Sequence, residues 1–157
     1  MNSAASDNLL AGEPADIPRP LYMDRIRPYI GIPAIKVLTG QRRVGKSRLL
    51  RQVAGEIRKA KPGSPVVFVD KERNEFDDIR TGADLLRFVE KTAGKKSCAL
   101  FVDEVQEIEG FDKALRSLLS EGKCDIYCTG SNADLLSSER PCQSQQNQPI
   151  PTLEISE

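Results

Sequence analysis

The chain of 157 residues has the length of one domain and no net charge, because 23 Lys and Arg balance 23 Asp and Glu. This balance gives no overall attraction to nucleic acid or to a membrane surface. The sequence has no histidine, which excludes His-dependent catalytic triads. No apolar run approaches the ~20 residues of a spanning helix, and no secretory signal opens the chain. We therefore expect a cytoplasmic protein that makes no membrane contact.

The four cysteines predict no zinc site. Cys98, Cys124 and Cys128 lie in or beside apolar, strand-like runs, where cysteine usually acts as a small buried hydrophobe. The C-x₃-C spacing of Cys124 and Cys128 has no second pair of ligands to complete a tetrahedral site. Any catalysis must then depend on carboxylates, lysine, arginine and a bound metal other than zinc.

The predicted elements alternate between strands and helices. Residues 1–18 are expected to form a disordered leader, because small and polar residues dominate and the apolar ones show no period. A short helix is expected to follow Arg19-Pro20. The next elements, in chain order, are a strand at 34–39, a helix at 47–57, a strand at 66–70, a charged surface loop at 71–80, a helix at 81–93, a strand at 98–104, an amphipathic helix at 111–119 and a strand at 124–129. This alternation predicts an α/β fold with a parallel sheet and right-handed crossovers.

The character of the sequence changes near Arg140. Residues 140–157 are polar, rich in glutamine and without a hydrophobic period. We expect this segment to be a disordered tail with no partner in the sheet.

A phosphate-binding motif, G-x-x-x-x-G-K-S, joins the first strand to the helix at 47–57. Glycine permits the tight turn and the close approach of the backbone to phosphate, and the N–H groups of the loop face the anion at a helix N-terminus. Lys46 is expected to reach the β- and γ-phosphates, and the Ser47 hydroxyl to bind Mg²⁺. The residues expected to surround the nucleotide are Gly40, Gln41, Arg42, Arg43, Val44, Gly45, Lys46, Ser47 and Arg48.

Two further stretches carry polar residues to the same edge of the predicted sheet, because ligands bind beyond the carboxyl ends of parallel strands. Asp103 and Glu104 follow the third strand; Asp103 is expected to hold Mg²⁺ through water, and Glu104 to polarise the attacking water. After the fourth strand, Asn132, or alternatively Ser131, is a candidate for contact with the γ-phosphate or that water. Asn132 is equally suited to cap the next helix.

The sequence lacks the N-K-x-D motif of guanine-specific enzymes, so ATP is favoured over GTP. A small-molecule kinase is disfavoured, because no segment obviously supplies an acceptor site and a lid.

Five segments together resemble the prokaryotic AAA-type predicted ATPases, whose core precedes a nuclease-like domain. They are Arg19-Pro20-Leu21-Tyr22, residues 35–47, Phe101-Val102-Asp103-Glu104-Val105-Gln106, Lys113-Ala114-Leu115-Arg116-Ser117-Leu118 and Thr129-Gly130-Ser131-Asn132-Ala133. The resemblance covers about residues 19–139 and implies a P-loop NTPase three-layer sandwich. It also implies ATP and Mg²⁺ as cofactors, catalytic roles for Lys46, Glu104 and Asn132, and Mg²⁺ binding by Ser47 and Asp103. Full-length members are expected to form homo-oligomers.

The resemblance ends near Glu139, where family members continue into a fifth strand, a lid and the C-terminal domain. We therefore expect a truncated copy with about four strands, in which the strand at 34–39 has an unpaired edge. Hydrolysis in AAA-type proteins usually needs an arginine from a neighbouring subunit, and nothing in the sequence places Arg116 or Arg140 in that role. Weak nucleotide binding and little turnover are expected, with a non-catalytic gene fragment or interaction remnant as the alternative.

A nucleic-acid-associated module is a second alternative. Its basis is a group of basic residues around the first long helix, Arg42, Arg43, Arg48, Arg51 and Arg58. A solvated helix face that also attracts phosphate explains the same residues and is favoured.

Overall fold

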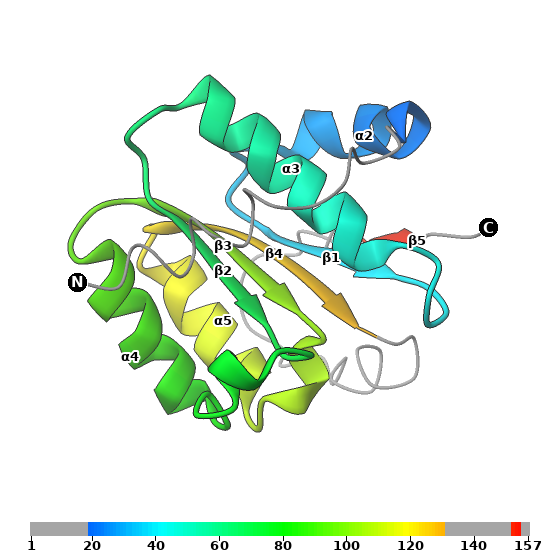
Figure 1. Ribbon diagram of the computed structural model, residues 1–157. Helices are drawn as coiled ribbons and strands as arrows, with labels where there is room; N and C mark the ends of the chain where they lie inside the picture. The colour runs from blue at the N-terminus through cyan, green and yellow to red at the C-terminus, as the bar shows by residue number, and fades with distance from the viewer. Residues whose placement is uncertain (1–18, 131–151, 155–157) are drawn as a thin grey trace, which may run out of the picture.

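A parallel sheet organises the protein (Figure 1). The computed structural model describes residues 19–130 and 152–154. Five strands pair in the order β2-β3-β4-β1-β5, and every pair is parallel. The strands are β1 (Ile35–Thr39), β2 (Val66–Asp70), β3 (Cys98–Asp103), β4 (Cys124–Gly130) and β5 (Thr152–Glu154).

Helices cover both faces of the sheet. They are α2 (Pro20–Ile26), α3 (Lys46–Ala60), α4 (Gly82–Ala93) and α5 (Phe111–Ser120). Helix α3 lies on one face with α2 against it, and α4 and α5 lie side by side on the other face (Figure 1). Helix α3 buries Leu49, Leu50 and Val53 completely, as its spacing of apolar residues predicts. The predicted three-layer α/β sandwich is therefore confirmed.

A row of aromatic side chains fixes the register of three strands. Phe68, Phe101 and Tyr127 are direct partners in the register of β2, β3 and β4. Their rings stack, with centroids 5.8 Å apart between Phe68 and Phe101 and 4.8 Å apart between Phe101 and Tyr127. Since a slip of one residue would turn these rings to the opposite face, the row holds the carboxyl ends of the three strands level.

The same row continues onto β1 through a buried lysine. Lys36 is the register partner of Tyr127, and its Nζ lies 4.9 Å from the centre of the Tyr127 ring. The Lys36 ammonium pairs with the carboxylate of Asp125 and donates to the carbonyl oxygen of Ile32. Tyr127 also donates its hydroxyl to Asp125 Oδ2 at 2.7 Å. A charge at a position that is 4% exposed is thus fully partnered.

We expected a sheet of about four strands in which the strand at 34–39 has an unpaired edge. This prediction is wrong, because that edge is paired with a fifth strand. Residues 152–154, which we expected to belong to a disordered tail without a partner, form β5 and pair with Val37, Leu38 and Thr39. The period-based analysis missed β5 because three residues are too few to show alternation. The predicted leader at 1–18 lies outside the described residues.

The other predicted elements agree with the structure to within a few residues, except for the loop at 71–80. This loop is folded around a short 3₁₀ helix, Asn74–Phe76, whose Phe76 is 2% exposed. The ammonium of Lys71 donates to the carbonyl oxygens of Phe76 and Ile79 at 2.7 and 2.8 Å. The composition suggested that the charges of this loop are solvated, but the Lys71 ammonium instead binds backbone carbonyl oxygens of the loop.

Candidate functional site

The carboxyl ends of the strands meet at one edge, as the sequence predicts. Asp70 at the end of β2 is the register partner of Asp103 at the end of β3. Thr39 at the end of β1 is the partner of Gly130 at the end of β4. The phosphate-loop motif leaves β1 at this edge, so the loop and the strand-end acids face the same space.

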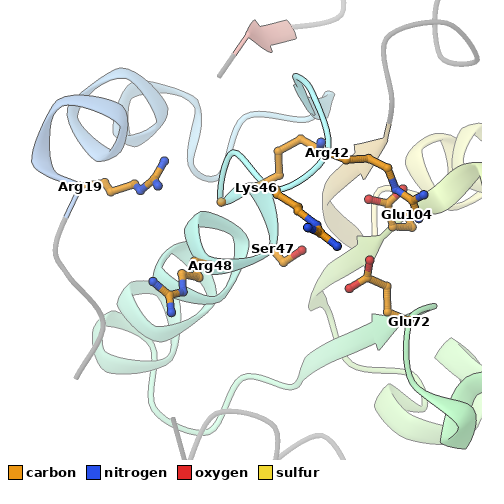
Figure 2. A pocket seen from close by; sticks show the side chains of 9 residues that line it. Arg19, Arg42, Lys46, Ser47, Arg48, Glu72 and Glu104 are labelled. Carbon is orange, nitrogen blue, oxygen red and sulfur yellow. The ribbon is translucent and has the colours of Figure 1, made fainter. Parts of the chain in front are cut away.

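A cavity of about 430 Å³ opens at this edge. Figure 2 shows Arg19 and Arg48 on one side of the loop and Glu72 and Glu104 on the other, with Arg42 extended toward Glu104. The residues that line the cavity are Arg19, Arg42, Arg43, Gly45, Lys46, Ser47, Arg48, Glu72 and Glu104. Five of these nine residues are cationic and two are acidic. An excess of positive charge at a helix N-terminus suits a polyanion such as a nucleotide phosphate chain.

The loop backbone adopts conformations that ordinary residues avoid. Arg43 has a φ of +68° and Gly45 a φ of +90°, both in the left-handed region. Such backbone geometry costs energy at a residue with a side chain and is typical of functional sites. It turns the chain sharply into α3, whose first residue is Lys46.

The Lys46 side chain is held by the loop itself. Its Nζ donates to the carbonyl oxygens of Gly40 and Gln41 at 2.7 and 2.8 Å, and the residue is 4% exposed. These contacts satisfy the ammonium while keeping it at the cavity wall, where it can exchange backbone acceptors for phosphate oxygens.

Arg19 reaches the loop from outside the motif. Its guanidinium donates to the carbonyl oxygen of Val44 at 2.7 Å. Its atoms lie 2.7 to 3.1 Å from the point where a Cβ on Gly45 would be. The sequence analysis assigned Arg19 no role, because a single arginine before a helix carries no signal that it will approach a loop 25 residues later.

Asp103 is fully buried behind the cavity. Burial raises the pKa of its carboxyl, the Ser47 and Thr129 hydroxyls oppose this rise, and the nearby charges of Asp70 and Glu104 add to it. Oxygen Oδ1 accepts a hydrogen bond from the Thr129 hydroxyl. Oxygen Oδ2 is buried and has no hydrogen-bond partner within the described residues. A cation beside Ser47 would satisfy this oxygen and favour the ionised carboxylate.

Glu104 lines the cavity and is held at two points. It is 9% exposed, and its backbone is left-handed, with a φ of +54°. Its N–H donates to the Thr129 hydroxyl at 3.0 Å. Its carboxylate accepts a hydrogen bond from the Gln106 side-chain amide. Neither Thr129 nor Gln106 was assigned a role from the sequence, although both lie in segments that carry the family resemblance.

Asp70 at the end of β2 and Glu72 just beyond it belong to a network that the sequence analysis also missed. Asp70 is 2% exposed and pairs with Arg51 of α3 at 3.0 Å. The Asp70 carboxylate also accepts from the N–H of Glu72 at 3.0 Å, and Glu72 faces the cavity. Since Arg51 is engaged inside the fold, the five arginines suggested as a nucleic-acid surface do not form one continuous free face.

The structure brings together most of the predicted site residues. Seven line the cavity, namely Arg42, Arg43, Gly45, Lys46, Ser47, Arg48 and Glu104. Gly40 and Gln41 contribute carbonyl oxygens to Lys46. Val44 is buried, and its carbonyl oxygen accepts the hydrogen bond from Arg19. Asp103 is fully buried next to Glu104. Asn132 and Ser131, and with them the proposed contact to the γ-phosphate, lie outside the described residues, as does Arg140.

One family comparison decides the membership of the chain. The sequence model of a family described as AAA domain matches residues 33–148. The chain belongs to the AAA domain family. This confirms the resemblance to AAA-type ATPases, and the match continues past Glu139, where we expected it to stop. The family match and the fold together show a P-loop ATPase-like core, which belongs to a nucleotide-binding class of domains.

Two similar proteins are longer than this chain. An uncharacterized protein of Haemophilus influenzae is 30% identical over 128 residues, covering 80% of this chain and 32% of that protein. An uncharacterized protein of Methanocaldococcus jannaschii is 32% identical over 107 residues, covering 67% of this chain and 23% of that protein. The chain thus spans at most about a third of the length of these two relatives.

Two solved structures are similar at low identity. AMPPCP-bound DnaA from Aquifex aeolicus has a TM-score of 0.46 at 15% identity, covering 88% of this AAA domain and 46% of DnaA. PCH-2 from Caenorhabditis elegans has a TM-score of 0.43 at 14% identity, covering 98% and 40% of the two chains. In the described part of the chain, no helix has the length and apolar character that crossing a bilayer requires.

Proposed function

We propose that this AAA domain binds ATP with Mg²⁺ in the cavity at the carboxyl edge of the sheet and hydrolyses it slowly. The observation that carries the proposal is the meeting, in one cavity, of the phosphate-loop residues Lys46 and Ser47 with the carboxylate of Glu104. In this arrangement the cations bind the phosphate chain, and the acid lies at the opposite wall, where a water molecule can attack.

The residues present fit a magnesium ion. The Ser47 hydroxyl and the unpartnered Oδ2 of Asp103 are oxygen ligands of the kind that Mg²⁺ prefers. Among residues 19–130 and 152–154 no group of three potential metal ligands gathers, so water and phosphate oxygens would complete the coordination. When bound, Mg²⁺ would neutralise charge on the phosphates.

Each polar residue then has a role in the reaction. Lys46 leaves the carbonyl oxygens of Gly40 and Gln41 to bind the β- and γ-phosphates. The oxygen of a water molecule forms a bond to the γ-phosphorus, and the bond from that phosphorus to the β–γ bridging oxygen breaks. ADP and phosphate are released, and one proton of the water passes to the Glu104 carboxylate. Asn132 is the candidate for a further contact with the γ-phosphate.

We expect slow turnover because hydrolysis in AAA-type proteins usually needs an arginine from a neighbouring subunit. Arg116 lies on α5 and is exposed, and it is not among the residues that line the cavity. An arginine that stabilises the transition state from a partner can contribute about 10³–10⁵ in rate. We expect the chain alone to bind nucleotide but to hydrolyse it without this contribution to the rate.

Calorimetric titration with ATP and Mg²⁺ tests the binding step. Lys46→Ala is expected to abolish saturable binding while the far-ultraviolet circular dichroism stays unchanged. Lys59→Ala is the matched control, because Lys59 is exposed near the other end of the same helix. Equal binding by the wild type and Lys46→Ala would reject the site.

Phosphate release tests the hydrolysis step separately. Glu104→Gln is expected to bind ATP and to lose turnover. A wild-type chain that binds ATP without releasing phosphate would reject hydrolysis and favour the non-catalytic alternative.

A further inference from the structure

Gln106 makes an unusual contact beside the cavity. It lies in the 3₁₀ helix Val105–Glu107, directly after Glu104. Its Nε2 donates to Oε2 of the Glu104 carboxylate. Its Oε1 is buried and has no hydrogen-bond partner within the described residues.

The orientation of the Gln106 amide follows from chemistry. The reverse orientation would place the amide oxygen against a carboxylate oxygen, and two acceptors repel each other. The nitrogen must therefore face Glu104, and the amide oxygen is left without a donor. A buried polar atom without a partner is unfavourable, and an apolar side chain at this position would avoid that arrangement. The structure thus holds a donor against Glu104 at the expense of the amide oxygen.

The backbone of Glu104 is fixed independently of Gln106. The left-handed conformation of Glu104 and the hydrogen bond from its N–H to Thr129 set the direction in which the side chain leaves the loop. The side chain of a glutamate still has three rotatable bonds. The contact with Gln106 is what selects one position of the carboxylate at the cavity wall.

We propose that Gln106 is a positioning residue for hydrolysis. Its amide holds Oε2 of Glu104, so that Oε1 is directed at the attacking water and receives the proton. Gln106 itself neither gains nor loses a proton. This role rests on the proposed function, because it assigns Gln106 to the same reaction at the same cavity.

A split between turnover and binding tests the proposal. Gln106→Met keeps the length of the side chain and removes the amide. It is expected to lower kcat about tenfold, while the Kd for a non-hydrolysable ATP analogue with Mg²⁺ changes less than twofold, because Gln106 does not line the cavity. Glu107→Gln is the matched control, since Glu107 is exposed in the same 3₁₀ helix, and it should change neither value. An unchanged kcat in Gln106→Met, or equal losses in kcat and affinity, would overturn the role.

A second measurement does not depend on turnover. In the full ¹⁵N-labelled chain, the side-chain amide resonances of Gln106 are assigned by their loss in Gln106→Met. They are expected to move in Glu104→Ala and to stay in place in Glu107→Gln. Resonances that do not respond to Glu104→Ala would refute the contact whether or not the chain hydrolyses ATP. A chain that binds ATP but releases no phosphate would instead refute the hydrolysis under Proposed function, and with it the role of Gln106 in catalysis.

Discussion

Arg19 donates a hydrogen bond from Nη1 to the carbonyl oxygen of Val44 at 2.7 Å, which ties the start of helix α2 to the phosphate loop. The loop residue that follows, Gly45, has no room for a side chain unless the Arg19 guanidinium moves. A segment far from the motif in sequence therefore helps to set the shape of the loop and adds a cation to the cavity.

We expect Arg19→Ala to weaken binding of ATP with Mg²⁺ about tenfold, or about 1.4 kcal/mol. The variant loses one cation at the cavity and one charge-assisted hydrogen bond that orders the loop. Calorimetry measures the change. Arg25→Ala serves as the control, because Arg25 is exposed in the last turn of the same helix. Equal affinities of the two variants would show that Arg19 does not contribute.

We expect Thr129→Val to lower the free energy of unfolding by about 2 kcal/mol or more. The substitution keeps the shape but leaves the N–H of Glu104 and Oδ1 of Asp103 buried without their partner, and each such group costs about 1–3 kcal/mol. Thr129→Ser retains the hydroxyl and should lose less. Urea denaturation gives both values, and a valine variant as stable as the serine variant would contradict the bridging role.

We expect Asp103→Asn to stabilise the nucleotide-free chain at neutral pH. Burial raises the pKa of Asp103 above its ordinary value of 3.8. As the pH rises, this carboxyl therefore ionises in the unfolded chain before it ionises in the folded chain. The free energy of unfolding falls until the pH reaches the pKa of the folded state. Asparagine cannot ionise. The gain should therefore be full at pH 8 and shrink as the pH approaches 4.

Denaturation curves at several pH values test this sign. Asp78→Asn, a substitution of an exposed acid in the loop after β2, is the control and should give no such trend. Mg²⁺ is expected to stabilise the wild type and not Asp103→Asn. A variant that is less stable than the wild type at pH 8 would reject the proposal that burial destabilises the ionised carboxylate.

We expect Asp84 to contribute to acid denaturation. Thr81 caps helix α4, and hydrogen bonds from the Thr81 side chain and N–H to Asp84 lower the pKa of that carboxyl to about 2. The stabilisation is present above the ordinary value of 3.8 and is lost as the pH falls from there through about 2. Asp84→Asn should flatten this part of the stability curve, and Glu90→Gln on the same helix should not. Identical curves for the wild type and Asp84→Asn would contradict the assignment.

The sequence predicts four of the five described strands and most of the cavity, because these depend on local patterns. The run at 66–70 and the motif at 40–47 each contain enough residues to define a strand or a loop without knowledge of the rest. Lys36 shows where this fails, because its burial depends on Asp125, a partner that no period connects to it.

The missed site residues share one physical reason. Arg19 and Thr129 contact the phosphate loop and Glu104 across 25 residues of sequence, and no local pattern predicts contacts between such distant segments. Gln106 differs, because it lies two positions from Glu104. Only the turn of the 3₁₀ helix, which the sequence analysis did not anticipate, brings its amide back onto that carboxylate.

The strand order also determines when, during synthesis of the chain, the strand that carries the phosphate loop can pair on both sides. Strand β1 pairs with β4 and β5. Ile35 can therefore pair only after Ile126 has been synthesised, and Val37 can pair with β5 only after Thr152 has been synthesised. Contacts of such long sequence separation form late, because loop closure must come first. A ribosome that has released the phosphate loop must therefore still synthesise the chain as far as residue 154 before the strand that carries the loop is paired on both sides. We therefore expect the phosphate loop to reach its final shape only after residues 152–154 have been synthesised and have paired with β1.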